Sequence, residues 1–258
     1  MNIQRAGAGP DLVVVHGWGM HCGVFADVLP ALREQFTVHL LDLPGHGANH
    51  ARERLPPLRR LAEELRQLLP TACWLGWSLG GQLAMTLACR FPARVRRLVV
   101  VASTPRWVRS TDWPLGMEDE VFESFATGLA SDHEATWQRF LALEVHGSKT
   151  ARRDLRHLRE LNRRWPAPTA QVLSDGLARL RETDLRPDVA QLTVPTLVIS
   201  GSRDRLVPPA AGDWLAAHLP QARHVLLRGL GHAPFIGDPE AFLSTLVPFL
   251  SATEVAHV

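Results

Sequence analysis

The stretch Gly76-Trp77-Ser78-Leu79-Gly80-Gly81 organises the rest of this chain. An apolar run at 72–75 precedes it and an amphipathic segment at 82–90 follows it, which predicts a strand, a tight G-x-S-x-G turn and a helix. Glycines suit a turn at which side chains would collide. A helix that begins at Leu79 directs its first N–H groups toward the hydroxyl of Ser78. Ser78 is therefore a candidate nucleophile, although the same residues would also suit a glycine-rich turn with a helix-capping serine.

Length and composition indicate one globular protein with room for an inserted subdomain. The chain has 258 residues, of which 46% are hydrophobic and 21% charged. A formal net charge of +2 argues against nucleic acid as a partner, and no apolar run approaches the roughly 20 residues of a membrane span. The N-terminal residues lack the apolar segment of a signal peptide, so we expect a cytoplasmic protein. The three cysteines have neither the spacing of a metal site nor that of a disulfide framework, so we expect no metal site. We also expect no cofactor and a monomeric protein.

Strand and helix patterns alternate along most of the chain but stop in its middle. Short β-branched runs at 12–15, 37–41, 98–101 and 196–200 predict strands, and 24–32 and 58–69 predict helices. Between Pro105 and Pro187 only helices are predicted, with Ser131, Ser148 and Thr169 as expected N-caps. This pattern predicts an α/β fold with a mostly parallel, doubly wound sheet and an inserted helical cap. We expect residues 1–104 and 188–258 to form the core and 105–187 the cap.

The loops that follow two later strands supply an acid and a base. Asp204 follows the strand at 196–200, and His232 follows the strand at 224–227 within Gly229-Leu230-Gly231-His232. The order Ser, Asp, His along the chain is that of the α/β-hydrolase triads. Asp42, Asp184 and Asp188 are other carboxylates, but none follows the strand that precedes the histidine strand. Ser78, His232 and Asp204 are therefore the predicted nucleophile, base and orienting acid.

A glycine-rich loop follows the strand at 12–15. Its sequence, His16-Gly17-Trp18-Gly19, resembles the segment that supplies one half of an α/β-hydrolase oxyanion hole. The expected donors are the backbone N–H groups of Trp18 and Leu79. Two such donors would stabilise the charge that develops on an ester carbonyl oxygen. The Asp42-Leu43-Pro44-Gly45-His46-Gly47 loop also resembles one found across α/β-hydrolases, where it is structural.

Four motifs together resemble those of the pimeloyl-[acyl-carrier protein] methyl ester esterase family of biotin synthesis. They are 16–20 (HGWGM), 75–81 (LGWSLGG), 139–143 (RFLAL) and 231–236 (GHAPFI), and the similarity runs from about Leu12 to Phe249. The resemblance implies hydrolysis of one methyl ester on a pimeloyl chain that acyl carrier protein carries. It also implies a set of substrate-contacting residues: Trp18, Ser78, Leu79, Phe140, Leu141, Ala142, Leu143, Glu144 and His232.

Arginines in the predicted cap bear on a carrier-protein partner. Arg152, Arg156, Arg159 and Arg163 recur at i, i+4, i+7 and i+11 and fall on one side of a helix. With Arg139 beside the RFLAL segment, we expect Arg139, Arg152, Arg156 and Arg159, the cap arginines, to dock an acidic carrier. A turn before Arg139 the chain has Ala135, where the resemblance leads us to expect another arginine. A solvated helix face would explain the same arginine pattern without a carrier protein.

The sequence leaves two alternative functions open. One is a general short-chain carboxylesterase that uses no carrier protein. The other is a receptor with the hydrolase fold that binds a small molecule.

Overall fold

A seven-stranded sheet forms the centre of the computed structural model, which describes residues 1–252. The strand order is β1-β3-β2-β4-β5-β6-β7, with β1 antiparallel to β3 and every other neighbouring pair parallel. The strands are β1 (Ile3–Ala6), β2 (Asp11–Val15), β3 (Thr37–Leu41), β4 (Ala72–Trp77), β5 (Val95–Val101), β6 (Thr196–Gly201) and β7 (Ala222–Leu227). The five residues of β3 and the six of β4 and β6 are all buried, as expected for parallel strands covered on both faces.

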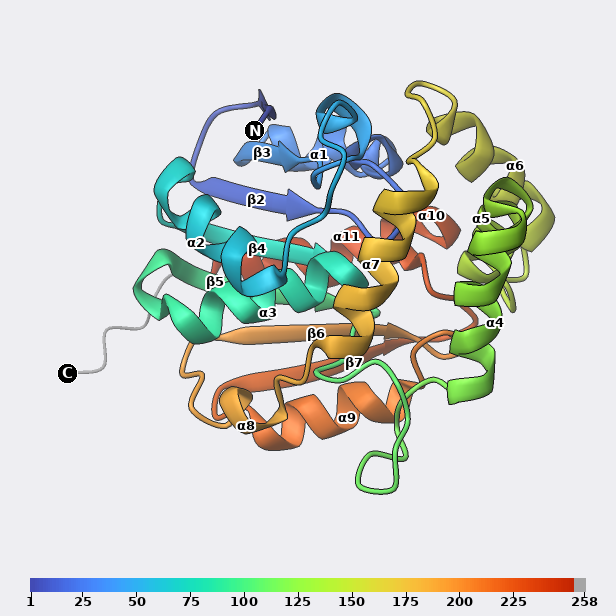
Figure 1. Ribbon diagram of the computed structural model, residues 1–258. Coiled ribbons are helices and arrows are strands. Elements are labelled where there is room, and N and C mark those ends of the chain that lie inside the picture. The colour runs from blue at the N-terminus through green and yellow to red at the C-terminus, as the bar shows by residue number, and fades with distance from the viewer. Residues whose placement is uncertain (253–258) are drawn as a thin grey trace.

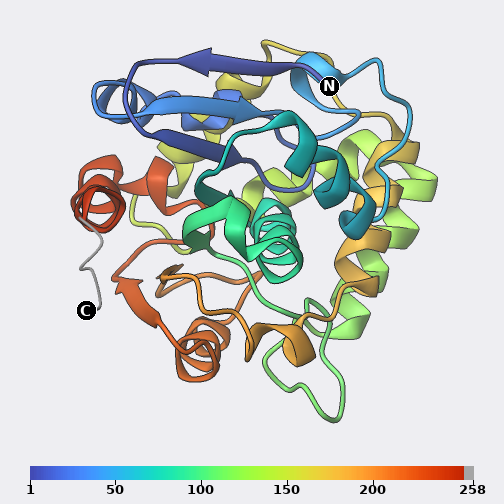
Figure 2. The ribbon, with the colours of Figure 1, turned by 90° about the vertical axis from the view of Figure 1, so that its left-hand side faces the viewer.

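Helices cover both faces of the sheet, so the predicted doubly wound α/β fold is confirmed. Figures 1 and 2 show α2 and α3 on one face and α11 on the other. The helices of this core are α1 (Leu29–Arg33), α2 (Leu58–Leu68), α3 (Leu79–Arg90), α9 (Pro209–His218), α10 (Pro234–Gly237) and α11 (Pro239–Ser251). Three short 3₁₀ turns lie at Cys22–Phe25, Gly47–Asn49 and Pro92–Arg94. No helix within residues 1–252 combines the length and apolar character needed to cross a lipid bilayer.

A helical insertion separates β5 from β6. Its helices are α4 (Asp119–Ser131), α5 (His133–Glu144), α6 (Ala151–Asn162) and α7 (Ala170–Glu182), and the short α8 (Arg186–Val189) leads back to the sheet. Figure 1 shows α4, α5 and α6 beyond the arrowheads of the strands, with α7 crossing near the same edge. The carboxyl ends of the strands therefore face the insertion, and this is the edge at which open α/β sheets bind ligands.

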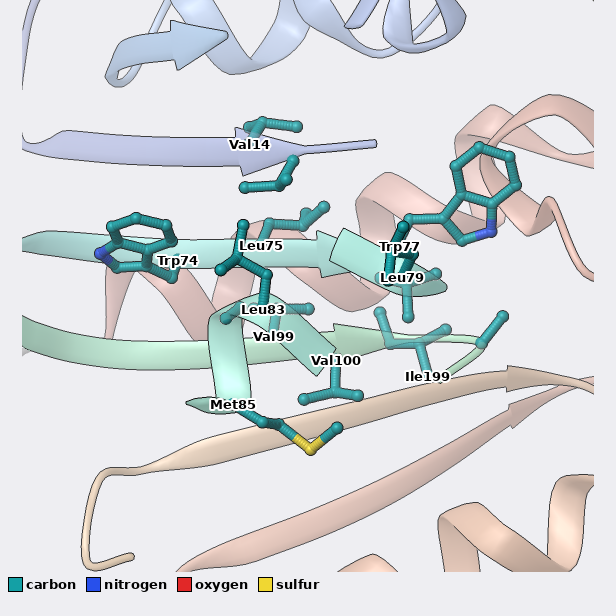
Figure 3. Packing of buried hydrophobic residues seen from close by; sticks show 14 of the residues in the cluster. Val14, Trp74, Leu75, Trp77, Leu79, Leu83, Met85, Val99, Val100 and Ile199 are labelled. Carbon is teal, nitrogen blue, oxygen red and sulfur yellow. The ribbon is translucent and has the colours of Figure 1, made fainter. Parts of the chain in front are cut away.

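The core packs tightly behind the central serine turn. Figure 3 shows Trp74 and Leu75 of β4 and Leu83 of α3 among the apolar side chains of the neighbouring strands. Leu75, Leu83 and Val99 are at most 1% exposed. Each fully buried Leu or Val contributes roughly 1.5–3 kcal/mol. This packing holds the junction of β4 and α3 in a fixed position.

Three local predictions within the helical segments were wrong. The helix expected at 24–32 is instead the 3₁₀ turn Cys22–Phe25 followed by α1, because Pro30 is best placed in the first turn of a helix. The cap of α5 is Asp132, whose Oδ1 accepts from Ala135 N at 2.9 Å, whereas Ser131 ends α4. Ser148 caps no helix; its hydroxyl donates to Asp154 Oδ2 at 2.9 Å, and α6 begins only at Ala151. The predicted cap at Thr169 is confirmed by its bond from Val172 N.

Candidate active site

Ser78 lies at the turn between β4 and α3 in a strained backbone conformation. Its φ is 58° and its ψ is −120°, a region that side-chain-bearing residues rarely adopt. A Cβ on Gly76 would lie 2.2 Å from Gly80 O, and one on Gly80 would lie 2.5 Å from Val15 O, so both positions require glycine. The hydroxyl of Ser78 is buried and has no hydrogen-bond partner among residues 1–252. The turn therefore holds an unpartnered hydroxyl at the carboxyl end of a central strand.

His232 and Asp204 form a buried pair at the carboxyl ends of β7 and β6. The Nδ1 atom of His232 lies 2.8 Å from Asp204 Oδ2, and both side chains are fully shielded from solvent. Asp204 Oδ1 accepts from the backbone N–H groups of Leu206 (2.8 Å) and Val207 (3.0 Å). Two backbone donors thus hold the carboxylate in place, which orients the ring of His232 and assigns a proton of that ring to Nδ1.

The histidine also contacts the turn that carries the serine. Trp77 Nε1 donates to His232 O at 2.8 Å, and the two rings are 5.8 Å apart. The Nε2 atom of His232, like the hydroxyl of Ser78, has no hydrogen-bond partner among the described residues. The structure thus places the two predicted reactive atoms, both unpartnered, in adjacent segments.

The charge state of His232 depends on two carboxyls. Burial by itself lowers the pKa of His232, but the charges of Asp204 and Glu144 and the bond to Asp204 outweigh it. The net pKa is raised above the ordinary value of 6.5. A raised pKa makes the imidazole a stronger base toward a hydroxyl proton.

The other candidate carboxylates have structural partners. Asp42 accepts from Cys22 N (2.7 Å) and Ala48 N (2.8 Å), which fixes the loop after β3. Asp184 lies 2.7 Å from Arg186, and Asp188 lies 3.7 Å from Arg59. None of the three contacts His232 within the part of the chain that the structure describes.

The loop after β2 lies directly against Ser78. A Cβ on Gly17 would lie 3.0 Å from the Cβ of Ser78. The backbone N–H of Trp18 has no bond among residues 1–252, and that of Leu79 begins a helix, where no intrahelical acceptor exists. The predicted oxyanion donors are therefore unengaged. His16 has a structural role: its Nε2 accepts from Leu43 N at 2.9 Å, and burial lowers its pKa to about 3.

The insertion supplies an aromatic and apolar wall to this site. Trp18 Nε1 donates to Leu173 O of α7 at 2.8 Å, and the ring of Trp18 packs edge-on against Phe140 of α5 at 4.6 Å. Leu141 is fully buried, while Ala142 and Leu143 are partly exposed. The last residue of α5 brings a carboxyl to the histidine, with Glu144 Oε2 3.8 Å from His232 Nε2.

One aromatic neighbour was not predicted. The ring of Trp107 lies 6.1 Å from that of His232, at nearly a right angle. Trp107 follows β5, and its only signal in the sequence was this place after the carboxyl end of a strand.

The cap arginines are exposed, and the side chains of two of them have no partner among the residues that the structure describes. The side chains of Arg152 and Arg156 on α6 form no ion pair within residues 1–252. Arg159 Nε donates to Gln138 Oε1 at 3.0 Å, and Arg139 donates to Thr136 Oγ1 at 3.2 Å.

No group of three or more His, Cys, Asp or Glu suited to a metal ion occurs among the described residues.

Comparisons with known proteins agree with this fold. The family profile described as "alpha/beta hydrolase fold" matches residues 10–239, and the chain therefore belongs to the α/β-hydrolase family. A bromoperoxidase from Bacillus anthracis has a similar fold, with a TM-score of 0.89 over 97% of this chain and 95% of the other, at 22% identity.

Sequence relatives narrow the family further. The pimeloyl-[acyl-carrier protein] methyl ester esterase of Nitrosomonas europaea is 45% identical over 247 residues, which are 95% of this chain and 97% of the relative. The protein of the same name from Stenotrophomonas maltophilia is 45% identical over 258 residues, covering 99% and 98%. Within the α/β-hydrolases the chain belongs to the pimeloyl-[acyl-carrier protein] methyl ester esterase family, as its motifs predicted.

Proposed function

We propose that this protein is a serine carboxylesterase that hydrolyses the methyl ester of pimeloyl-[acyl-carrier protein] methyl ester in biotin biosynthesis. The products are pimeloyl-[acyl-carrier protein] and methanol. The observation that carries this proposal is the 45% identity that extends over nearly the whole chain, helical insertion included. The unpartnered Ser78 hydroxyl beside the His232–Asp204 pair supports ester hydrolysis as the reaction.

The reaction would proceed through an acyl-enzyme on Ser78. His232 Nε2 accepts the hydroxyl proton as Ser78 Oγ attacks the ester carbonyl, and Asp204 stabilises the imidazolium that forms. The N–H groups of Trp18 and Leu79 would bind the oxyanion. The imidazolium then gives its proton to the departing methoxy oxygen, which leaves as methanol. Water hydrolyses the acyl-enzyme by the same steps in reverse.

The insertion would act as a cap that holds the acyl chain. We assign residues 105–187 to this cap and 1–104 with 188–258 to the core. The contact of Phe140 with Trp18 and the burial of Leu141 support α5 as one wall of the pocket. Ala142, Leu143 and Glu144 complete the substrate segment. A cytoplasmic location and a monomeric state stay predictions from the sequence.

The carrier protein would dock on the cap arginines. Their exposed guanidinium groups, free of ion pairs at Arg152 and Arg156, suit an acidic helical partner. Such contacts act on encounter and docking, so their loss should raise KM for the carrier-bound ester and leave kcat nearly unchanged.

The test compares two substrates and two triple variants. Arg139, Arg152 and Arg156 are changed together to Glu, and the matched control changes three exposed arginines outside the cap that lack ion pairs, namely Arg5, Arg33 and Arg96. The first variant should raise KM for the carrier-bound pimeloyl methyl ester at least tenfold at low salt, less at high salt, and leave the protein-free ester unaffected.

Each alternative has its own outcome in this test. Equal kcat/KM for the carrier-bound and protein-free esters, unchanged in the triple variant, would identify a general carboxylesterase. Absence of alcohol release from either ester and from a p-nitrophenyl ester would identify a receptor. An equal rise in KM for the carrier-bound ester in the two triple variants would refute docking of the carrier on the cap arginines.

A further inference from the structure

The carboxyl of Glu144 is a buried group to which the triad chemistry assigns no step. Its side chain is 1% exposed, and neither carboxyl oxygen has a hydrogen-bond partner among residues 1–252. Its Oε2 lies 3.8 Å from His232 Nε2, an atom that is likewise buried and unpartnered. Buried polar atoms almost always have a hydrogen-bond partner, so these two nearby atoms are suited to share one small polar group.

The backbone fixes the position of this carboxyl. Glu144 O accepts from Ala233 N at 3.1 Å, which joins the end of α5 to the residue after the histidine. A Cβ on Gly231 would lie 3.2 Å from Glu144 O and 2.9 Å from His146 O, so the two segments are in direct contact. On the other side, Arg203 donates to Gly147 O at 2.9 Å. The turn after α5 is therefore held by both loops that carry the acid and the base.

The surroundings of Glu144 favour its neutral form. Burial is the largest cause; with the opposing charge of His232 and the smaller contribution of the Asp204 charge, the net pKa is raised to about 8. His232 and Asp204 are the titratable groups that face it from the core loops; the guanidinium of Arg203 is bonded to Gly147 O, and His146 is exposed. In either protonation state the carboxyl has an oxygen that accepts a hydrogen bond.

The spacing of these atoms suits one bridging oxygen. His232 Nε2 and Glu144 Oε2 are 3.8 Å apart, so an oxygen to one side of both can lie at an ordinary hydrogen-bond distance of about 2.8 Å from each. We propose that Glu144 positions the water that hydrolyses the acyl-enzyme, an inference that rests on the ester hydrolysis proposed above. The water transfers one proton to His232 Nε2 as its oxygen attacks the acyl carbonyl. Its second hydrogen stays on the oxygen and forms a hydrogen bond to the carboxyl of Glu144. The tetrahedral intermediate then collapses, the bond to Ser78 Oγ breaks, and the imidazolium returns the proton to Oγ.

Two kinds of substitution at this position separate water positioning from packing. Glu144→Gln keeps an accepting carbonyl oxygen in the same place, whereas Glu144→Leu is close in size but has no acceptor. A third variant, Glu144→Met, provides a second apolar side chain of adaptable shape if the branched leucine fails to fold. Each protein is mixed with p-nitrophenyl butyrate in a stopped-flow instrument, which gives the burst rate for acylation and the steady-state rate for deacylation. Intact-protein mass spectrometry measures the butyryl adduct on Ser78.

The expected result is a selective loss of deacylation. Glu144→Leu and Glu144→Met should deacylate at least tenfold more slowly, the effect of one lost hydrogen bond in the transition state, and should accumulate the adduct. Their burst rates should stay within about threefold of the wild type, and Glu144→Gln should stay within threefold on both steps. Equal losses on both steps, or normal deacylation in the apolar variants, would overturn the role of Glu144. A wild-type protein that neither releases p-nitrophenol nor forms a Ser78 adduct would refute the ester hydrolysis itself, whatever Glu144 does.

Discussion

Replacement of Asp204 by asparagine tests the orientation of the proposed base. Asp204 Oδ1 accepts two backbone N–H groups, from Leu206 and Val207, while Oδ2 faces His232 Nδ1. An asparagine has one accepting oxygen, and the two N–H donors would draw it to the position of Oδ1. The NH₂ group would then face Nδ1 and force that atom to accept, which moves the ring proton to Nε2. An Nε2 that carries a proton cannot take one from Ser78.

The size of the loss follows from this change of tautomer. The same change in a chymotrypsin-type triad lowers turnover by roughly 10,000-fold, and we expect a similar factor here. At 1.36 kcal/mol per tenfold, that corresponds to about 5.4 kcal/mol in the activation free energy. The fold should be kept, because the substitution is isosteric and the two backbone donors retain their acceptor.

The assay is steady-state hydrolysis of a p-nitrophenyl ester, with far-UV circular dichroism to confirm folding. The chain offers a matched control, since the exposed Asp213 forms a similar pair with His224, at 2.7 Å. Asp213→Asn should keep wild-type turnover. A loss of less than tenfold in Asp204→Asn, or a comparable loss in Asp213→Asn, would refute the assignment of Asp204 as the orienting acid.

Three further outcomes are expected. Ser78→Ala should abolish turnover and adduct formation without unfolding the protein, because no other nucleophile is placed at the elbow; more than a few per cent residual activity would contradict the triad. The pKa of His232 is raised above 6.5, and the neutral imidazole is the active form. The value of kcat/KM should therefore fall as pH decreases through a midpoint above 6.5. A midpoint below 6.5 in a pH–rate profile would contradict the charges assigned to this site. Gly231→Ala places a Cβ against His146 O and Glu144 O, so thermal melts should show that the folded protein is destabilised by about 1–3 kcal/mol. An unchanged melting temperature would show that the two segments can move apart at no cost in stability.

Local sequence patterns were sufficient where neighbouring residues determine the structure. The turn at Ser78 needs glycine at positions 76 and 80, because the strand and the helix approach too closely for a Cβ. The spacing of these glycines around the serine can be recognised in the sequence. The predicted strands and the helical insertion were confirmed for the same reason, since side-chain periodicity reports burial on each element. One-residue features were less secure: Asp132 caps α5 in place of Ser131, because neighbouring polar residues compete for one capping position.

The tertiary structure decided what depends on contacts between distant segments. Asp204 and His232 are 28 positions apart, and the 2.8 Å bond between them distinguishes Asp204 from Asp184 and Asp188. The catalytic roles of the predicted residues stay predictions, but their environments could not be read from residue type at all. Glu144 has a pKa of about 8 only because α5 docks on the histidine loop and excludes water from its carboxyl. Desolvation and charge are properties of the assembled site, so the residue type places a carboxyl at position 144, but only packing raises its pKa and brings it close to the base.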